Sequence, residues 1–450
     1  MNTNKSRDKV KLSKYNIVTE VDDKHAIFNT RTSSVVMLNK EMYQRLFVEK
    51  RYGAADDLQY IEPLVDMGIL VDEDQDENFY LETIRRRFKY SVTGVRSVVI
   101  AVTTECNARC YYCYENGIHR ENMTLETADA IVDFLSKNCV NNQIVIQWFG
   151  GEPLCAVEII DHITEGLHNK GVRISSIITT NGYGVTDEIL KKAKDSWNVK
   201  RFQIPVDALG EQYNKIKNYV QVESGSKPFE RIINNIHKVL KAGFHVNVRT
   251  NFHPLNIEPT REVLDFLAKE FSEEDHFFAY PAPLTGENIP SVVDLSTGRD
   301  IHPYLELLLE SRKMGFLCPT LLKEERYYDG DESLSGISLA SRPIGCYATL
   351  FGSFAIDSKG DLYKCHRLLG RGEQYTCGNV YKGIVYNNVL KSFCEDTLCY
   401  SECNECALMP LCHGGCKVKK EWYGGMNGCV AIKSIVEDVV KIYVKELYQK

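Results

Sequence analysis

The chain has 450 residues, 44% of them hydrophobic and 26% charged, which is ordinary for a folded globular protein with several domains. The formal net charge of −7 does not favour general nucleic-acid binding, and no apolar run approaches the ~18 residues that a transmembrane helix needs. The first residues, MNTNKSRDKVKLSKYNIV, lack the apolar core of a signal peptide, so we expect a cytoplasmic location. In that reducing compartment, sixteen cysteines indicate metal binding more than disulfides.

Residues 1–84 predict a compact unit of short strands and helices in the order of a small winged-helix domain. Strand patterns occur at Tyr15–Glu20, His25–Asn29, Ser33–Met37 and Ile69–Val71, and helix patterns at residues 39–49 and 57–67. The acidic run Asp72–Glu77 is expected to be a solvated turn. The basic residues that follow are expected to line a solvated helix face; they are Arg85, Arg86, Arg87 and Lys89.

Residues 95–282 alternate between apolar strands and amphipathic helices, which predicts an α/β fold with parallel strands. The strand candidates are Val98–Val102, Ile144–Phe149, Ile174–Ile178, Phe202–Val206, His245–Arg249 and His276–Tyr280. The helix candidates are Leu125–Asn138, Glu158–Asn169, Asp187–Lys194, Glu230–Lys241 and Pro259–Glu270. Six such units predict an open, partial (β/α)6 barrel with its active residues at the carboxyl ends of the strands.

The rest of the chain is less periodic. Residues 283–345 are expected to form a bridging region with a helix near Pro303–Met314, and residues 431–450 a terminal amphipathic helix. Residues 346–430 are rich in cysteine and glycine, so bound metal must supply much of their order.

A C-x3-C-x2-C run follows the first predicted barrel strand and contains Cys106, Cys110 and Cys113. Three thiolates can hold three irons of a four-iron cluster and leave the fourth iron open to a small molecule. The alternatives are a zinc site, which prefers four ligands, or buried thiols. His119 is expected on the far side of the loop, and no nearby pair completes a zinc site.

This run, with the aromatic Tyr112 before its last cysteine, resembles the motif of the radical S-adenosylmethionine enzymes. The resemblance implies a [4Fe–4S] cluster on the three cysteines, whose unique iron binds S-adenosylmethionine and whose electron generates a 5'-deoxyadenosyl radical. It also implies that Tyr112 packs near the adenine, and an oxygen-sensitive enzyme, so we expect the organism to be an anaerobe.

Further matches to this family follow the next strands. Gly150, Gly151, Glu152 and Pro153 resemble the GGEP segment that holds the methionine amino group, and Asn181 in TTNG stands where the family contacts ribose or carboxylate. Asp207 resembles the acid of an S-x-D-G motif, although Pro205 and Ala208 depart from that pattern; a helix cap or turn is its alternative. Arg249 could pair with the cosubstrate carboxylate or form a structural salt bridge.

The downstream cysteines resemble the SPASM extension of peptide-modifying radical enzymes, although C-x2-C pairs also occur in structural zinc sites. The resemblance implies two auxiliary [4Fe–4S] clusters, three clusters in all. One would be closed by Cys403, Cys406, Cys412 and Cys429, and the other would be held by Cys346, Cys365 and Cys416. The second set lacks a further cysteine soon after Cys346, which implies an open iron unless Cys377 binds it. We hypothesise that this iron binds a substrate thiolate.

By this resemblance the chain is similar to thioether-forming maturases of the sactipeptide and cysteine-rich SCIFF-type ranthipeptide kind. Expected partners are a ribosomal precursor peptide, whose leader would add a strand to the N-terminal unit, and an electron donor such as flavodoxin or ferredoxin; neither nucleic acid nor a membrane is expected. The open alternatives are formylglycine formation as in anaerobic sulfatase maturation, quinone-cofactor maturation, a non-catalytic iron–sulfur electron carrier and a zinc-dependent peptide scaffold.

Overall fold

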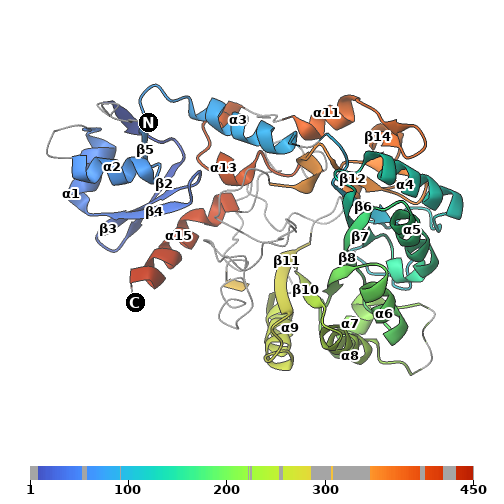
Figure 1. The fold of residues 1–450 in the computed structure, drawn as a ribbon. Coiled ribbons are helices and arrows are strands. Elements are labelled where there is room, and N and C mark those ends of the chain that lie inside the picture. The colour runs from blue at the N-terminus through green and yellow to red at the C-terminus, as the bar shows by residue number, and fades with distance from the viewer. Residues whose placement is uncertain are drawn as a thin grey trace.

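A single ten-stranded sheet runs through most of the molecule in a computed structural model (Figure 1). The structure describes residues 9–52, 58–91, 93–220, 222, 225–252, 257–284, 306–307, 345–395, 401–418 and 432–448. The strand order is β11-β10-β9-β8-β7-β6-β12-β13-β14-β15, so the sheet is open. The predicted bridging region, including its helix near Pro303–Met314, lies almost wholly outside the described residues.

Six of these strands are parallel and adjacent in chain order, which confirms the α/β prediction. They are β6 (Ser97–Ala101), β7 (Gln143–Phe149), β8 (Arg173–Thr179), β9 (Val199–Pro205), β10 (His245–Phe252) and β11 (Phe277–Pro283). Because each strand returns through a helix, all six carboxyl ends meet at one edge of the sheet. The arrangement is consistent with a partial (β/α) barrel.

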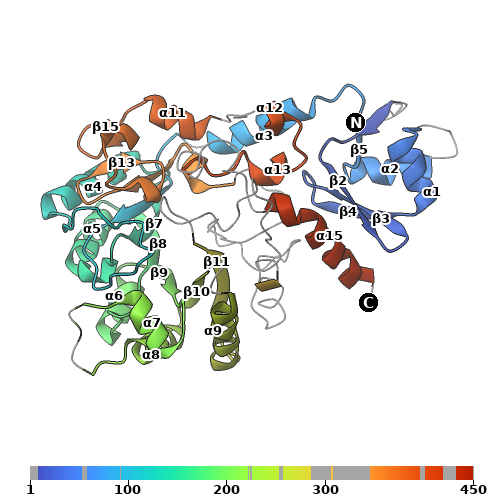
Figure 2. The ribbon, with the colours of Figure 1, turned by 180° about the vertical axis from the view of Figure 1, so that it is seen from behind.

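Helices cover one face of this sheet and bury their apolar sides against it (Figures 1 and 2). They are α4 (Leu125–Asn138), α5 (Val157–Asn169), α6 (Asp187–Asp195), α8 (Pro228–Lys241) and α9 (Ile257–Glu270). Side-chain caps fix two of their starts, since Thr124 accepts from Thr127 N and Thr186 accepts from Ile189 N. A further short helix, α7 (Gly210–Lys217), follows β9 and was not predicted.

The cysteine-rich region extends the same sheet. Its strand β12 (Ser353–Ile356) pairs in parallel with β6, and β13 (Asp361–Tyr363), β14 (Thr376–Asn379) and β15 (Gly383–Ile384) continue antiparallel. Short helices complete the region: η5 (Tyr347–Thr349), η6 (His366–Leu368), η7 (Glu373–Tyr375), α11 (Asn388–Cys394), α12 (Ser401–Asn404) and α13 (Met409–Cys412). The pairing of β12 with β6 fixes this region beside the strand that leads to the first cysteines.

The N-terminal unit forms two small sheets. Strands β2 (Asn16–Val21), β3 (Lys24–Asn29) and β4 (Ser34–Leu38) are antiparallel, and β1 (Val10–Leu12) pairs with β5 (Leu70–Asp72). In place of the predicted first helix, a short α1 (Lys40–Tyr43) continues into a π-helix, η1 (Gln44–Val48). Helix α2 (Leu58–Asp66) follows. The C-terminal helix α15 (Ile432–Tyr448) packs on β2 and β3. The winged-helix assignment stays a prediction.

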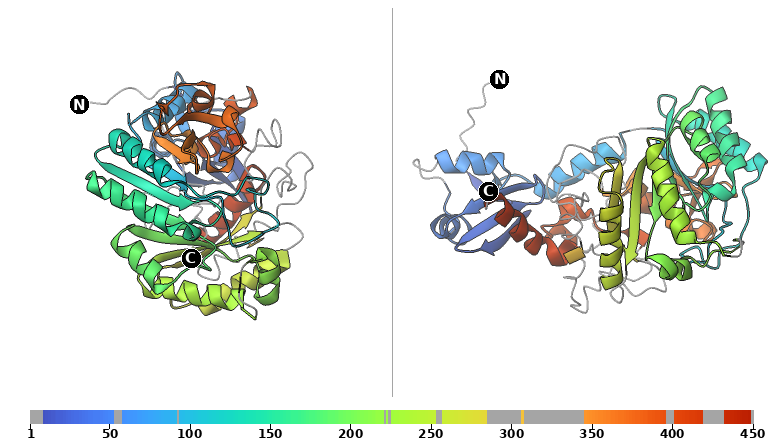
Figure 3. Two further views of the ribbon diagram at one scale, coloured as in Figure 1. Left: turned by 90° about the vertical axis from the view of Figure 1, so that its right-hand side faces the viewer. Right: turned by 90° about the horizontal axis from the view of Figure 1, so that it is seen from below.

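Helix α3 (Glu77–Lys89) follows the N-terminal unit in the chain and extends away from it (Figure 3). Its side chains contact the cysteine-rich region. The expected solvated basic face is wrong for two residues, because Arg85 and Lys89 are only 2% and 5% exposed. Arg85 donates to Met409 O at 3.3 Å and to His413 Nδ1 at 3.1 Å. Glu77 is also buried and accepts from Ser13 Oγ at 2.6 Å, so the predicted solvated turn ends before it. Charged residues therefore hold α3 in place, Glu77 against the N-terminal unit and Arg85 against the cysteine-rich region.

Within the described ranges, no helix combines the length and the apolar character needed to cross a bilayer.

Candidate functional site at the carboxyl ends of the strands

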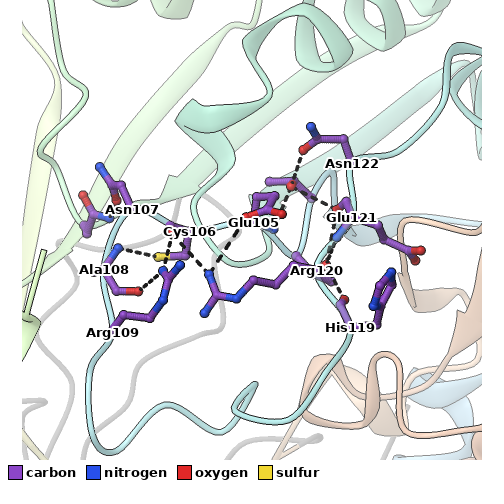
Figure 4. Close-up of polar contacts among 12 residues, drawn as sticks. Glu105, Cys106, Asn107, Ala108, Arg109, His119, Arg120, Glu121 and Asn122 are labelled. Atoms are coloured by element: carbon purple, nitrogen blue, oxygen red, sulfur yellow. Dashed lines mark hydrogen bonds and ion pairs between the residues drawn. The ribbon is translucent and has the colours of Figure 1, made fainter. Parts of the chain in front are cut away.

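The loop after β6 carries Cys106, Cys110 and Cys113, and its base is closed by hydrogen bonds (Figure 4). Thr104 N donates to Glu121 O at 2.9 Å, and Thr104 Oγ1 donates to the His119 carbonyl at 2.7 Å. His119 thus contributes its backbone to the loop base, and its ring lies on the other side of Arg120 from Cys106. The returning segment holds both ends of the cysteine loop together.

The three thiols of this loop act on one another electrostatically. Burial, together with the nearby Glu152, Cys110 and Cys113, raises the pKa of Cys106 to about 12. Burial also raises the pKa of Cys113. Such thiols stay protonated unless a cation replaces the proton, and a bound metal does so. The donor set therefore fits a metal centre.

Three thiols carried on one loop fit a four-iron cluster, in which each thiolate binds a separate iron and the sulfurs need only surround the cluster. Within the parts of the chain that the structure describes, no three His, Cys, Asp or Glu side chains form a candidate site for a single metal ion.

Gly150 and Gly151 let the end of β7 touch the cysteine loop. A Cβ on Gly150 would lie 2.1 Å from Thr103 O, and one on Gly151 would lie 2.3 Å from Glu105 O. The same approach forms two hydrogen bonds, from Gly151 N to Thr103 O at 2.9 Å and from Glu152 N to Glu105 O at 2.8 Å. Only glycine permits this contact, and Gly150 also adopts a φ of +124°.

The Glu152 side chain links the segment after β7 to the segment after β8 by hydrogen bonds. Its carboxylate accepts from Thr180 Oγ1 at 2.6 Å, Asn181 N at 2.7 Å and Leu154 N at 3.1 Å. A carboxylate offers about four acceptor positions, so about one remains for a ligand such as an ammonium group. Pro153 is buried at the start of η3 (Pro153–Cys155), and Asn181 Nδ2 donates to Asn107 Oδ1 in the cysteine loop at 2.6 Å.

Asp207 is engaged differently from Glu152. Its Oδ2 accepts from the Tyr112 hydroxyl and from Lys217 Nζ at 2.7 Å. Its Oδ1 accepts from the backbone and side-chain nitrogens of Asn251, both at 2.9 Å. These contacts use all its acceptor positions. Arg249 donates through Nε to Asn251 Oδ1 at 2.9 Å. Burial, then the charge of Arg367 and then that of Arg249 lower the pKa of His366 to about 3, so Arg249 lies within electrostatic range of the cysteine-rich region.

Sequence reasoning missed Lys217, which joins Tyr112 and Asp207. The available signal was the i,i+4 pair Tyr213 and Lys217 in EQYNKIK, both of which are buried on α7. A lysine on an apolar helix face is rarely left unpaired, and of the two acids that precede it most closely, Glu211 is exposed whereas Asp207 is buried.

A second group of thiols comes from distant parts of the cysteine-rich region. Burial, with the nearby charges of Cys346 and Cys416, raises the pKa of Cys365 to about 12. Cys346 is exposed, Cys365 is buried and Cys416 is half-buried. The Cys377 Sγ donates to Leu362 O at 3.4 Å, and the charges nearest to it are those of Lys364 and Cys394.

An aromatic cluster connects the two thiol groups. Tyr114, His366 and Tyr347 directly follow Cys113, Cys365 and Cys346 respectively. The His366 ring lies 6.4 Å from that of Tyr114 and 5.9 Å from that of Tyr347, whose hydroxyl is 2.8 Å from His366 Nδ1. It also lies 5.1 Å from Phe149, the last residue of β7. The second thiol group therefore lies beside the carboxyl edge of the sheet.

The last expected cysteines are only partly described. Cys403, Cys406 and Cys412 lie on α12, α13 and the turn between them, where Cys406 N donates to Cys403 O at 3.3 Å. Cys429 lies outside the described residues, so the ligand set of this cluster stays a prediction.

Comparisons with known proteins agree with this site. Residues 100–267 match the radical SAM superfamily model. A probable GTP 3',8-cyclase of Methanococcus maripaludis (strain S2) is 30% identical over 234 residues, which cover 50% of this chain and 77% of that protein. The cysteine-type anaerobic sulfatase-maturating enzyme of Clostridium novyi (strain NT) is 25% identical over 370 residues, 74% of this chain and 92% of that protein.

The fold is shared with solved structures of native anSMEcpe. With bound AdoMet its TM-score is 0.56 at 16% identity, covering 78% of this chain and 99% of that chain. With AdoMet and a Cp18Cys peptide its TM-score is 0.54, at the same identity and coverage. For several other curated relatives the match covers only 36% to 58% of their length.

The match over residues 100–267, the relative of 30% identity and the loop built on Cys106, Cys110 and Cys113 lead to one conclusion: the chain belongs to the radical SAM superfamily.

Proposed function

We propose that this enzyme forms thioether cross-links between a cysteine sulfur and a carbon atom within a ribosomal precursor peptide. Its broader character, a radical SAM enzyme related to peptide and sulfatase maturases, follows from the superfamily and from its Clostridium novyi relative. The observation that carries the finer proposal is the second thiol group, Cys346, Cys365 and Cys416, beside the carboxyl edge of the sheet.

In this proposal the loop thiols hold one [4Fe–4S] cluster and the segment Gly150–Pro153 receives S-adenosylmethionine. When bound, these groups supply a radical that removes a hydrogen atom from the substrate. Glu152 offers its remaining acceptor position to the methionine ammonium group, and its bonds to Thr180 and Asn181 keep it fixed. Gly150 and Gly151 keep that carboxylate against the cysteine loop.

The second thiol group supports capture of a substrate sulfur. Three cysteines leave one position of a four-iron cluster for an outside ligand, and a thiolate is the natural one. Burial raises the pKa of the Cys346 thiol to about 11, so this thiol lies in the protected surroundings that a cluster ligand needs, and Cys377 donates to Leu362 O. The Tyr114 hydroxyl is buried and has no hydrogen-bond partner among the described residues, so a bound group would satisfy it.

Each cross-link removes two hydrogens from the peptide. One leaves the carbon as a hydrogen atom and is recovered in 5'-deoxyadenosine, while the thiol loses a proton and the bond-forming step returns one electron to the enzyme.

The N-terminal unit is proposed to bind the leader as an added strand. Within the described residues β2 and β4 each pair with β3 alone, so both are edges of this sheet; β2 contacts the long helix α15 and β4 contacts the short helix α1. We assign the peptide to the outer edge of β4 because the longer helix packs on the β2 side. Hydrogen exchange tests this directly: leader peptide should protect the amides of residues 34–38, and protection confined to β2 would contradict the assignment.

The decisive experiment is mass spectrometry of a leader-bearing, cysteine-rich precursor after anaerobic reaction with the reconstituted enzyme. We expect the peptide to lose two hydrogens per bridge. When the hydrogen on the acceptor carbon is isotopically labelled, the label should be recovered in 5'-deoxyadenosine. A matched peptide with alanine for cysteine should still support cosubstrate cleavage but gain no bridge. If the cysteine peptide leaves the auxiliary cluster spectrum unchanged, sulfur capture by that cluster is refuted.

Formylglycine formation is the second candidate, favoured by the long alignment with the Clostridium novyi enzyme over 74% of this chain. It predicts an aldehyde at a single cysteine or serine and no need for a leader. Trapping of the product with a hydrazide would support this reaction, and an unreactive, cross-linked product would exclude it.

A further inference from the structure

A buried ion pair contacts the cysteine loop, and one of its members, Lys217, lies outside the segments that resemble the family motifs. Asp207 and Lys217 are 2% and 1% exposed, and Lys217 Nζ lies 2.7 Å from Asp207 Oδ2. Removing two charges from water is costly, so such a pair persists only where its remaining hydrogen-bonding capacity is met. Here it is largely met by groups of the site itself.

Asp207 has no capacity left for a ligand. Tyr112 and Lys217 occupy Oδ2, and Asn251 occupies Oδ1 twice. Burial opposes its ionisation, but Lys217 and the Tyr112 hydrogen bond outweigh burial and hold the pKa of Asp207 below its usual range. Asp207 is therefore a fixed anion that organises its neighbours and does not itself reach the cosubstrate.

Lys217 connects that anion to the cysteine loop in two ways. Its Nζ donates to the Tyr112 hydroxyl at 2.7 Å and lies 5.4 Å from the centre of the Tyr112 ring. Its backbone carbonyl accepts from Arg109 N at 2.8 Å, and Val220 N donates to Asn107 O at 2.8 Å. The end of α7 and the segment after it thus hold the loop at two points between Cys106 and Cys110.

Lys217 also lies within electrostatic range of a cysteine of the loop. Burial disfavours its charge, but Asp207, Tyr112 and then Cys110 overcome burial and hold the pKa of Lys217 well above its ordinary value. The ammonium thus stays charged beside a candidate cluster ligand, and Asp207 balances it.

We propose that Lys217 and Asp207 are positioning residues of the radical SAM site: they fix Tyr112 and the Cys110 segment, and their charges set the electrostatic environment of the cluster held there. The inference concerns the superfamily site and is independent of the thioether reaction. It assigns work to Lys217, which no motif includes, and gives Asp207 a role other than direct contact with the cosubstrate.

The test uses full-length, anaerobically reconstituted K217M, D207N, K217R and the double variant D207N/K217M. The control is K215M, because Lys215 is exposed on the same helix. The cluster is followed through the spectroscopic signal of its reduced state, which should change when S-adenosylmethionine is added. Its midpoint potential, the affinity for S-adenosylmethionine, the iron content and the melting temperature are measured for each.

Opposite charge changes should move the potential in opposite directions. K217M removes a cation and should make the cluster harder to reduce, whereas D207N removes an anion and should make it easier. Affinity for S-adenosylmethionine should fall at least about tenfold in K217M through loss of the Tyr112 contact, be partly restored in K217R, and stay unchanged in K215M.

A merely structural pair would give another pattern. If K217M and D207N lower the melting temperature but leave the potential and the affinity at wild-type values, the proposal is overturned. Shifts of the potential in the same direction would also overturn it. If K217M does not fold, the other two single variants still decide. The proposal requires that K217R, which retains the positive charge, keep the wild-type potential, and that D207N, which lacks the anion, have a raised potential.

Discussion

The contact between β7 and the cysteine loop can be tested by one added methyl group. In Gly151→Ala the new Cβ would lie 2.3 Å from Glu105 O and 2.7 Å from Thr104 O, both backbone atoms. Real Cβ contacts essentially never fall below 3.0 Å, so the loop must retreat by at least 3.0 − 2.3 = 0.7 Å. The loop carries the first cysteines, so the cluster ligands move with it.

The size of the effect follows from that displacement. A misplacement of about 1 Å in an active site can cost about 100-fold, so 0.7 Å should cost on the order of 25-fold. The hydrogen bond from Glu152 N to Glu105 O, 2.8 Å long, is strained by the same movement. We expect affinity for S-adenosylmethionine to fall by about that factor, measured by equilibrium dialysis of the reconstituted enzyme.

Gly171→Ala is the matched control. Gly171 has a φ of +75°, but a Cβ there would meet no atom within 4 Å. It should cost about 1–2 kcal/mol of stability and leave the affinity unchanged. The reasoning is refuted if Gly151→Ala binds S-adenosylmethionine within threefold of wild type, or if Gly171→Ala loses as much affinity as Gly151→Ala does.

Three further predictions concern the cysteine-rich region. Cys365→Ala should lower the iron content by about one four-iron cluster, whereas Cys377→Ala, whose thiol donates to Leu362 O, should retain it; equal losses by iron analysis would make Cys377 a ligand. Arg85→Met removes buried bonds to Met409 O and His413 and should destabilise the chain by about 2–4 kcal/mol in denaturant unfolding, while exposed Arg87→Met should be neutral. Burial raises the pKa of Asp357 to about 6, so its contribution to stability is fully present below the unfolded value of 3.8 and is lost as pH rises through about 6. Asp357→Asn should remove up to about 3 kcal/mol of that pH dependence, and unfolding curves that keep the wild-type slope from pH 4 to 7 would contradict it.

The parallel strands were predictable because buried apolar residues recur along each of them and amphipathic helices alternate with them along the chain. β6, for example, lies within a residue of its predicted bounds. The same pattern located the cysteine loop, since it directly follows that strand. What the sequence could not give was the partner of β6 on its other side, because the pairing of Ser353 with Ser97 spans most of the chain. Local patterns carry no information about such register.

The charged residues were the other failure. Arg85 and Lys89 read as solvent-facing because long basic side chains usually are, but their acceptors are backbone carbonyls contributed by distant residues. Lys217 was missed for a related reason: the sequence does not show which acid a buried lysine meets, and its partner Asp207 lies ten residues away in the chain.

The contact of α15 with β2 and β3 imposes an order on biosynthesis. Val436, Val439, Val440 and Val444 are buried in one cluster with Val21, Ala26 and Phe28. This sheet is therefore covered by a helix that is synthesised only after the barrel, and its apolar face stays uncovered while the barrel is translated. The N-terminal unit is completed only once α15 has been made, and until then the nascent enzyme presents a surface for chaperones.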